Sequence, residues 1–300
     1  MYREWAPWGQ ECRLLGGLTA YELGDWDGVI RRLDLAGRPA PQPGRAIFTA
    51  AAMSVQAGRG APVDPALLDA LRQWWHVDGI CVVLTVMPAV DLLGQSGDLA
   101  AILDLTEAAV RVLDSTWGDY HAIVRLAALV AGQAAALVPH ADPALRVRAL
   151  AVVDELADRG RRISEPRPAV ERLSRPAFER SAAGSLEDTS RETWAWTARL
   201  EAELPRLQRV AGVADPPPVA ALVDAWRESV AAFERYGHVY EAARSRGRLA
   251  VALRAAGDQA ASRDVAEQAR EVALRLEAKP LLAELDDVRP APAASHAAGE

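Results

Sequence analysis

Apolar residues recur three or four positions apart along almost the whole chain, as they do on one face of an α-helix. Runs of alternating apolar and polar residues between hairpin turns, which would indicate β-strands, are absent from the sequence. The one strand-like run, GICVVLTVM at residues 79–87, continues past Pro88 into AVDLLG, so we interpret it as part of a buried helix. The pattern therefore predicts an all-α fold.

Short glycine-containing turns divide the expected helices into pairs. Such joints occur at Gly24-Asp25, Gly58-Arg59-Gly60, Gly97-Asp98 and Gly257-Asp258. Glycine ends a helix in the left-handed conformation, and an aspartate that follows it caps the next helix. The first three joints are 34 and 39 residues apart, and tetratricopeptide repeats have a period of about 34 residues. Such pairs bury their apolar faces only by stacking, so we expect tetratricopeptide-like helix pairs that form an α-solenoid.

Two changes in composition suggest how the chain is organised. Residues 159–185 begin with a stretch rich in arginine and proline, and proline opposes a continuous helix. We therefore expect N-terminal helical repeats over residues 1–158, an irregular connector over 159–185 and C-terminal helical repeats over 186–288. The alanine- and proline-rich end, residues 289–300, is expected to be a disordered tail.

The C-terminal third carries a recognisable series of packing residues. The series consists of aromatic, small and turn positions, namely Trp226, Phe233, Gly237, Tyr240, Ala243, Arg246, Ala250, Gly257, Asp258, Leu276, Ala278, Pro280 and Leu281. Over residues 193–287 the sequence resembles the tetratricopeptide-like sensor region of the large ATP-binding transcriptional regulators of the bacterial LuxR type. The similarity is looser over residues 1–160.

The resemblance implies a role in signal input for transcription regulation. In that family an ATPase module precedes the sensor region, and a helix-turn-helix DNA-binding domain follows it. Neither has a counterpart in this sequence, which lacks the phosphate-binding pattern GxxxxGK[ST]. We therefore expect the chain to be either a fragment of a larger regulator or a stand-alone relative.

Charge and composition limit the partners. The formal net charge is -7, and nearly all 34 basic residues are arginine. The scarcity of lysine and the absence of asparagine are typical of a GC-rich genome. The basic residues are not clustered as phosphate binding requires, so we expect no direct contact with nucleic acid. The start of the chain does not resemble a signal peptide, and the two cysteines have no paired spacing, so we expect a cytoplasmic protein without a membrane segment.

Motifs for catalysis or metal binding are absent from the sequence. It contains no HExxH, no GxSxG elbow and no histidine pair spaced for a metal on one helix. We therefore predict a non-enzymatic protein with no cofactor, no metal site and no catalytic residues. An enzyme whose site is assembled from dispersed residues is the remaining alternative.

The aromatic residues are the main candidates for ligand binding. Nine tryptophans against three phenylalanines is an unusual ratio, and flat amphipathic rings line many binding sites. The candidate groove residues are Trp74, Trp75, His76, Trp117, Tyr120, His121, Trp194 and Trp196. Trp117, Tyr120 and His121 share one helical face by their spacing, and we expect them and Trp75 to face the inner surface of the superhelix. The alternative interpretation is that these rings pack between stacked helices as core.

A cluster of three arginines is a second candidate. Arg244, Arg246 and Arg248 have the charge to contact an anionic partner, or they pair with Glu241 and nearby acids on the surface. We expect the surface pairing.

These observations favour a non-catalytic regulatory module in which a small-molecule effector, a protein or a peptide binds the repeat groove. The alternative is a stand-alone protein-interaction scaffold with the same architecture. The sequence leaves self-association into a homo-oligomer open.

Overall fold

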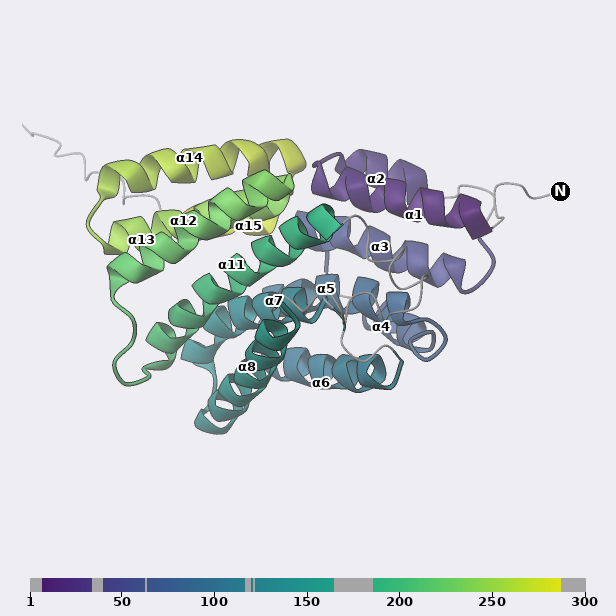
Figure 1. Cartoon of the computed structure of the whole chain (residues 1–300), viewed down its shortest axis with the longest axis horizontal. Coiled ribbons are helices and arrows are strands. Elements are labelled where there is room, and N and C mark those ends of the chain that lie inside the picture. The colour runs from purple at the N-terminus through teal and green to yellow at the C-terminus, as the bar shows by residue number, and fades with distance from the viewer. Residues whose placement is uncertain are drawn as a thin grey trace, which may run out of the picture.

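The fold is all-helical, as predicted. A computed structural model describes residues 7–33, 40–62, 64–116, 120, 122–164 and 186–286. Within these ranges there are thirteen α-helices and no strand (Figure 1). The strand-like run at residues 79–87 is helical, so that interpretation is confirmed.

The helices follow one another with short connections in most places. Those of the N-terminal part are α1 (Pro7–Glu22), α2 (Trp26–Leu33), α3 (Gly44–Arg59), α4 (Pro65–Arg72), α5 (Gly79–Gln95), α6 (Leu99–Thr116), α7 (Ala122–Leu137) and α8 (Pro143–Ser164). A short 3-10 helix, η2 (Val138–His140), lies between α7 and α8. The C-terminal part contains α11 (Leu186–Ala211), α12 (Val219–Tyr236), α13 (Val239–Ala255), α14 (Gln259–Leu276) and α15 (Lys279–Asp286).

The predicted glycine joints are real helix ends. Gly24, Gly97 and Gly257 have φ values of +78°, +78° and +88°, which is the left-handed conformation that favours glycine. At the remaining joint the left-handed residue is Gly60, with φ +74°, whereas Gly58 belongs to α3. Gly58 has a packing role instead, because a Cβ atom there would lie 2.3 Å from the ring of the buried Trp26.

The aspartates that follow these glycines cap the next helices. Asp25 accepts a hydrogen bond from the amide of Gly28 at 2.9 Å, and Asp98 accepts one from Ala101 at 2.9 Å. Asp258 accepts from Ala261 at 3.0 Å. Each bond satisfies a backbone N–H that the first turn of a helix leaves free, so the prediction of aspartate caps is confirmed.

Most helices pack against the next helix in the chain and against the next but one. The last helix, α15, also packs against α3. Near this contact, the Tyr236 hydroxyl donates to Glu22 at 2.7 Å, so α12 is joined to α1. A buried cluster contains residues from α1, α2 and α3 together with residues from α13, α14 and α15. Helices from the two ends of the chain therefore meet, and Figure 1 shows the end of α14 facing the end of α2.

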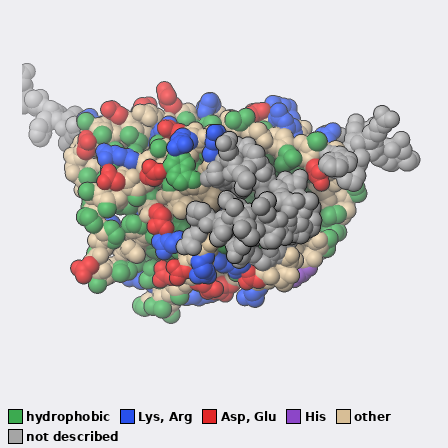
Figure 2. All heavy atoms as spheres, in the orientation of Figure 1, with side chains coloured by type: hydrophobic (Ala, Val, Ile, Leu, Met, Phe, Trp, Pro, Cys, Tyr) green, Lys and Arg blue, Asp and Glu red, His purple; other side chains and the backbone are tan. Residues whose placement is uncertain are grey.

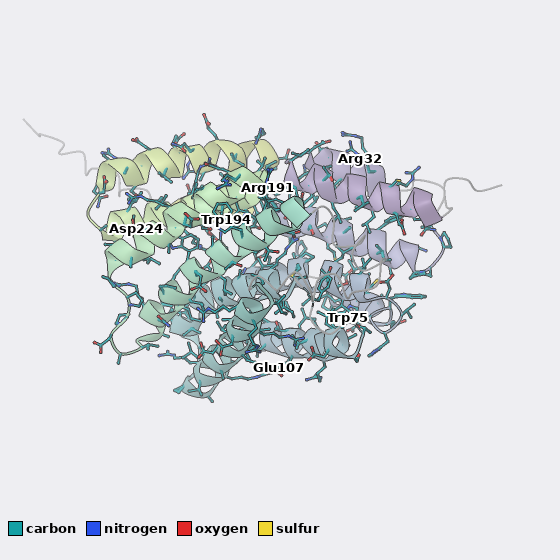
Figure 3. All side chains as sticks on the ribbon, in the orientation of Figure 1. Arg32, Trp75, Glu107, Arg191, Trp194 and Asp224 are labelled. Atoms are coloured by element: carbon teal, nitrogen blue, oxygen red, sulfur yellow. The ribbon has the colours of Figure 1, made fainter. Side chains whose placement is uncertain are left out.

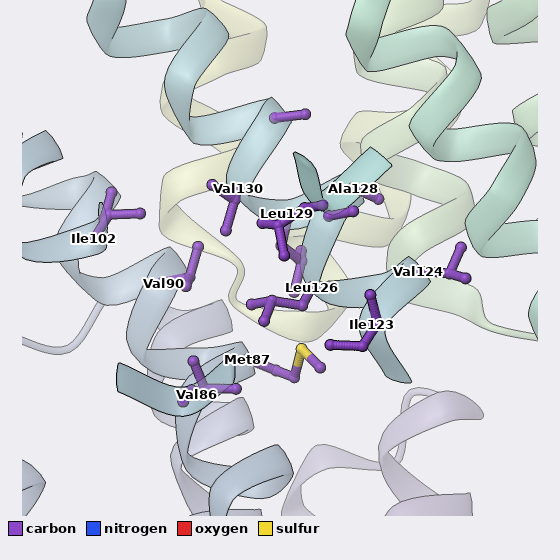
Figure 4. Packing of buried hydrophobic residues seen from close by; sticks show 14 of the residues in the cluster. Val86, Met87, Val90, Ile102, Ile123, Val124, Leu126, Ala128, Leu129 and Val130 are labelled. Carbon is purple, nitrogen blue, oxygen red and sulfur yellow. The ribbon is translucent and has the colours of Figure 1, made fainter. Parts of the chain in front are cut away.

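One large hydrophobic core runs through the middle of the molecule. It extends from α3 to α13 and includes Trp196 and Phe233 of the C-terminal half. Figure 4 shows part of it, where Val86 and Val90 of α5 lie close to Leu126 and Val130 of α7. The expected N-terminal and C-terminal repeats therefore share a single core.

The expected connector begins too early. Helix α8 continues through Ser164, six residues beyond the predicted boundary at 158, and the first proline of the connector, Pro166, follows in the sequence. Residues 165–185 and the expected tail, 289–300, lie outside the described residues.

One segment of the described residues, Ala122–His140, has the length and composition of a membrane span. However, 61% of its most apolar window is buried inside the protein. Leu126, Val130 and Ala134 are fully buried in the core described above. Its apolar character is therefore accounted for by packing within the fold.

Candidate functional site

The aromatic candidates do not form one site. Figure 3 shows Trp75 beside α4 and α6, and Trp194 on α11, in a different part of the molecule. Trp74 and Trp194 are partly buried against the core, and the Arg235 guanidinium lies 4.9 Å from the ring centre of Trp194. Trp196 is a core residue with only 2% of its surface exposed, so it does not line a groove.

The predicted Trp117, Tyr120 and His121 face cannot be assembled from this structure. Trp117 and His121 lie outside the described residues. Tyr120 is described and partly buried, and burial raises the pKa of its hydroxyl. Trp75 and His76 are therefore the candidates whose surroundings carry the argument.

These two residues line a cleft between the end of α4 and the C-terminal half of α6. The cleft has a volume of about 370 Å³ and is lined by Arg72, Trp75, His76, Ala108, Arg111, Val112 and Ser115. Trp75 belongs to the core and is 3% exposed. The Arg72 guanidinium lies 5.4 Å from its ring centre, a cation–π distance. The cleft thus combines a rigid aromatic wall with a cation held against it.

The cleft carries positive charge without a matching acid. None of its lining residues is acidic. The side chains of Arg72, Arg111 and His76 make no hydrogen bond or ion pair with any other described residue. By contrast, Arg148 of α8 pairs with Asp104 at 2.7 Å and with Glu107 at 2.9 Å on the same helix α6. The acids of α6 therefore pair with α8 and leave the arginines of the cleft uncompensated.

A second hollow of about 380 Å³ lies between α8 and α11. Its acidic side chains include Asp158 and Glu201, but Arg161 lies 2.8 Å from Glu201 and 3.6 Å from Asp158. Asp154 also lines this hollow, so its acids outnumber its one arginine, but no aromatic residue lines it. The cleft beside Trp75, which combines charge with an aromatic ring, is the better candidate.

The interior contains a buried network of ion pairs. It joins α5, α11 and α13 through Asp91, Arg199, Glu203, Arg206, Glu241 and Arg244. Glu203 lies at its centre with no exposed side-chain surface, 2.8 Å from Arg199 and 2.7 Å from Arg206. Arg199 also donates to Ser245 at 3.1 Å and stacks 4.9 Å from the ring centre of Trp226. The network holds α11 against α12 and α13.

The second half of the network connects distant parts of the chain. Arg244 of α13 donates to Asp91 of α5 at 3.0 and 3.1 Å and to Glu241 at 3.1 Å. Gln133 of α7 donates to the same Asp91 at 2.8 Å. Asp91 of α5 therefore connects to both α7 and α13, and α13 lies far from α5 in the sequence.

All three arginines of the α13 cluster pair with acids of the protein, but not all of these pairs lie on the surface. Arg246 pairs with Glu234 at 2.5 Å, and Arg248 pairs with Glu284 at 3.1 Å. The expected pairing of Arg244 with Glu241 is present. Its expected location is wrong, because Arg244 is buried where α13 packs toward α5.

The arginines keep the central carboxyl ionised. Burial alone would raise the pKa of Glu203, but Arg206 and Arg199 outweigh it and lower that pKa to about 2. A carboxylate held this firmly between two cations is a poor proton donor or acceptor at neutral pH. The network therefore supports helix packing better than acid–base chemistry.

His238 occupies a buried aromatic cage at the start of α13. The rings of Tyr21, Trp196, Phe233 and Tyr236 surround it, with centroids 5.5 to 6.5 Å away. Its Nδ1 accepts a hydrogen bond from the Glu241 amide at 3.4 Å, so this buried histidine caps α13. Its Nε2 has no hydrogen-bond partner among the described residues. Burial, aided by Arg125 and Arg244, lowers its pKa to about 3.

We expect this histidine to make the fold sensitive to acid. The unfolded chain binds a proton at His238 near the ordinary pKa of 6.5, whereas the folded chain does so only near 3. Stability is therefore lost as the pH falls below 6.5, by about 2 kcal/mol at pH 5. Urea unfolding above pH 6.5 and at pH 5 should show that the free energy of unfolding falls less for His238→Asn than for the wild type. Asparagine keeps a side-chain acceptor for the cap.

The difference between the two proteins in this loss of unfolding free energy is due to the histidine. Glu22, whose pKa is raised by burial, acts in the opposite direction but is present in both proteins. An equal loss of stability in the wild type and in His238→Asn would contradict the prediction.

No group of three or more His, Cys, Asp or Glu side chains within the described residues is placed to hold a metal ion. On the face shown in Figure 2, basic and acidic side chains are interspersed among hydrophobic ones, without a large basic patch.

The residues that sequence reasoning missed are Arg72 and Arg111. Arg72 lies three residues before Trp75, so the sequence could have pointed to it. No local pattern connects Arg111 with Arg72 or Trp75.

Comparisons with protein-family models, with curated proteins and with solved structures found no match to this chain. The case for a function therefore depends on the site itself.

Proposed function

We propose that this chain is a non-catalytic, ligand-sensing helical module of a LuxR-type transcriptional regulator, acting in the cytoplasm. The observation that carries the proposal is the cleft between α4 and α6. It combines a suitable volume, a buried tryptophan wall and uncompensated arginines in one place. Ligand sites are typically concave, mostly apolar and equipped with a few polar groups, and their volumes start at about 300 Å³.

The packing of the C-terminal third supports the regulator resemblance. Trp226 and Phe233 are fully buried on one face of α12, and Tyr240 and Ala243 are buried on α13. Gly237 ends α12 in the left-handed conformation. These positions have the packing and turn roles expected of tetratricopeptide-like helix pairs stacked as an α-solenoid, which is the architecture we propose.

The contacts between distant helices suggest how binding could be sensed. A ligand shifts a conformational equilibrium only if it binds one conformation better than another. The two helices that border the cleft, α4 and α6, both pack on α5, and α5 is tied to α13 by the Asp91–Arg244 pair. A change in the packing of α4 and α6 on α5 would therefore act on an element that contacts α13.

The proposal is tested by screening the purified chain against metabolites and peptides, with tryptophan fluorescence and thermal unfolding as readouts. A true effector should lose its binding in Ser115→Phe, which fills the cleft at an exposed position of α6. Its binding should persist in Ala260→Phe, which adds the same bulk to an exposed position of α14. Sensing further requires that the effector change amide hydrogen exchange in α13, away from the cleft.

Two outcomes would count against the proposal. Equal binding by both variants would place the ligand elsewhere. A screen without any ligand would favour the stand-alone scaffold, in which the same helices present a surface to a protein partner.

A further inference from the structure

We infer that the cleft between α4 and α6 selects a small organic anion, a carboxylate or phosphate group carried on a flat apolar body. The inference rests on the proposed ligand-binding function and specifies the chemistry of the ligand. It depends on three properties of the cleft, namely its unpaired charge, its aromatic wall and its size.

The charge of the cleft calls for an anion. Arg72 and Arg111 both line it, and neither side chain has an ionic or hydrogen-bonding partner among the described residues. The structure pairs most of the neighbouring arginines, since Arg148 and Arg159 of α8 bind acids of α6. In a chain of net charge -7, a site lined by two unpaired arginines and no acid is a local exception. Guanidinium groups bind carboxylate and phosphate oxygens through paired hydrogen bonds.

The walls of the cleft call for an apolar body on the anion. Trp75, Ala108 and Val112 supply hydrophobic surface, and Trp75 and Val112 are buried in the core. The indole N–H of Trp75 is buried and has no acceptor among the described residues, so the wall also contains an unsatisfied donor. The Ser115 hydroxyl already donates to the Val112 carbonyl at 2.8 Å, so the donors exposed to a ligand are those of the arginines and His76.

The position of Arg72 favours binding of a planar group. Its guanidinium stacks on the Trp75 ring at 5.4 Å, which restricts the side chain before any ligand arrives. A restricted donor loses less conformational entropy on binding than a free one. The volume of about 370 Å³ suits a one- or two-ring molecule and is too small for a folded partner.

The test compares three matched probes by isothermal titration calorimetry on the full chain. The probes are 2-naphthoate, its neutral isostere 2-naphthamide, and 2-naphthyl phosphate. We expect at least one of the two anions to bind and the amide to bind at least about tenfold more weakly, since a charged hydrogen bond is worth about 1.5–3 kcal/mol. The comparison of the two anions identifies the preferred head group.

The arginines are tested by Arg72→Gln and Arg111→Gln, with Arg263→Gln as the matched control. All three arginines are exposed, and the side chain of Arg263 donates to the Gln259 carbonyl of its own helix and to no other described residue. We expect each cleft variant to weaken anion binding about tenfold or more and the control to leave it unchanged. Unfolding curves establish that the variants remain folded.

Several results would overturn the inference. If 2-naphthamide binds as tightly as the anions, the cleft selects shape and not charge, and the proposed ligand-binding function stands. If the anions bind equally well to the two cleft variants and the control, they bind elsewhere. If no probe binds while the screen yields a neutral effector that Ser115→Phe excludes, the anion inference fails and the proposed function survives.

Discussion

Replacing Glu203 by alanine should destabilise the fold by about 3–5 kcal/mol, the range found when one member of a buried ion pair is removed. Glu203 has no exposed side-chain surface and lies between Arg199 and Arg206 at 2.8 and 2.7 Å. Its removal leaves two largely buried guanidinium groups without their carboxylate. Chemical denaturation at pH 7 measures the loss directly.

The control for this prediction lies two residues away. Glu201 on the same helix pairs with Arg161 at 2.8 Å, but both side chains are 46% exposed. An exposed pair contributes at most about 1 kcal/mol, so Glu201→Ala should have a small effect. Similar effects of the two substitutions would show that the interior network does not depend on Glu203.

The second large effect concerns the pair between Asp91 and Arg244. We expect Arg244→Met to cost about 3–5 kcal/mol, because among the described residues it leaves Asp91 with Gln133 as its only remaining side-chain partner. In a double-mutant cycle with Asp91→Asn, the two changes should be non-additive by about 1–3 kcal/mol. Unfolding curves of the four proteins give this coupling energy.

A solvent-exposed pair provides the reference cycle. Arg227 and Asp224 lie 3.1 Å apart, a distance similar to that of the buried pair, but their side chains are 58% and 75% exposed. Their coupling should be under about 1 kcal/mol. Coupling energies of equal size in the two cycles would mean that burial does not strengthen the contact between α5 and α13.

The features predicted from the sequence are the ones that depend on neighbouring residues. A glycine ends one helix and the aspartate after it caps the next, without help from distant residues. The joints at Gly24, Gly97 and Gly257 and their caps are therefore as predicted. The all-α fold follows from periodicity in the same way. The predicted connector starts at residue 159, whereas α8 runs through Ser164, because the arginines after residue 158 do not end a helix and the first proline comes only at Pro166.

The candidate site could be predicted only in part, because it depends on contacts between residues that are distant in the sequence. Trp75 and His76 were identified by their aromatic character, but the sequence does not tell a core ring from a groove ring. Trp196 is a core ring, whereas Trp75 belongs to the core and also lines the cleft. The partner of Arg244 is Asp91, 153 residues away, and no local pattern connects the two. Such pairings arise only from the way the helices are arranged in space.

The contacts between helices from the two ends of the chain constrain the number of helices between them. The hydrogen bond between Tyr236 and Glu22 spans 214 residues, and α15 packs on α3. In an open array each repeat contacts only its neighbours, so evolution can lengthen or shorten the array by duplicating or deleting a helix pair. Here a helix pair inserted or deleted between α3 and α12 would separate both contacts at once. We expect natural variation in this protein to occur in the loops and not in the number of helix pairs.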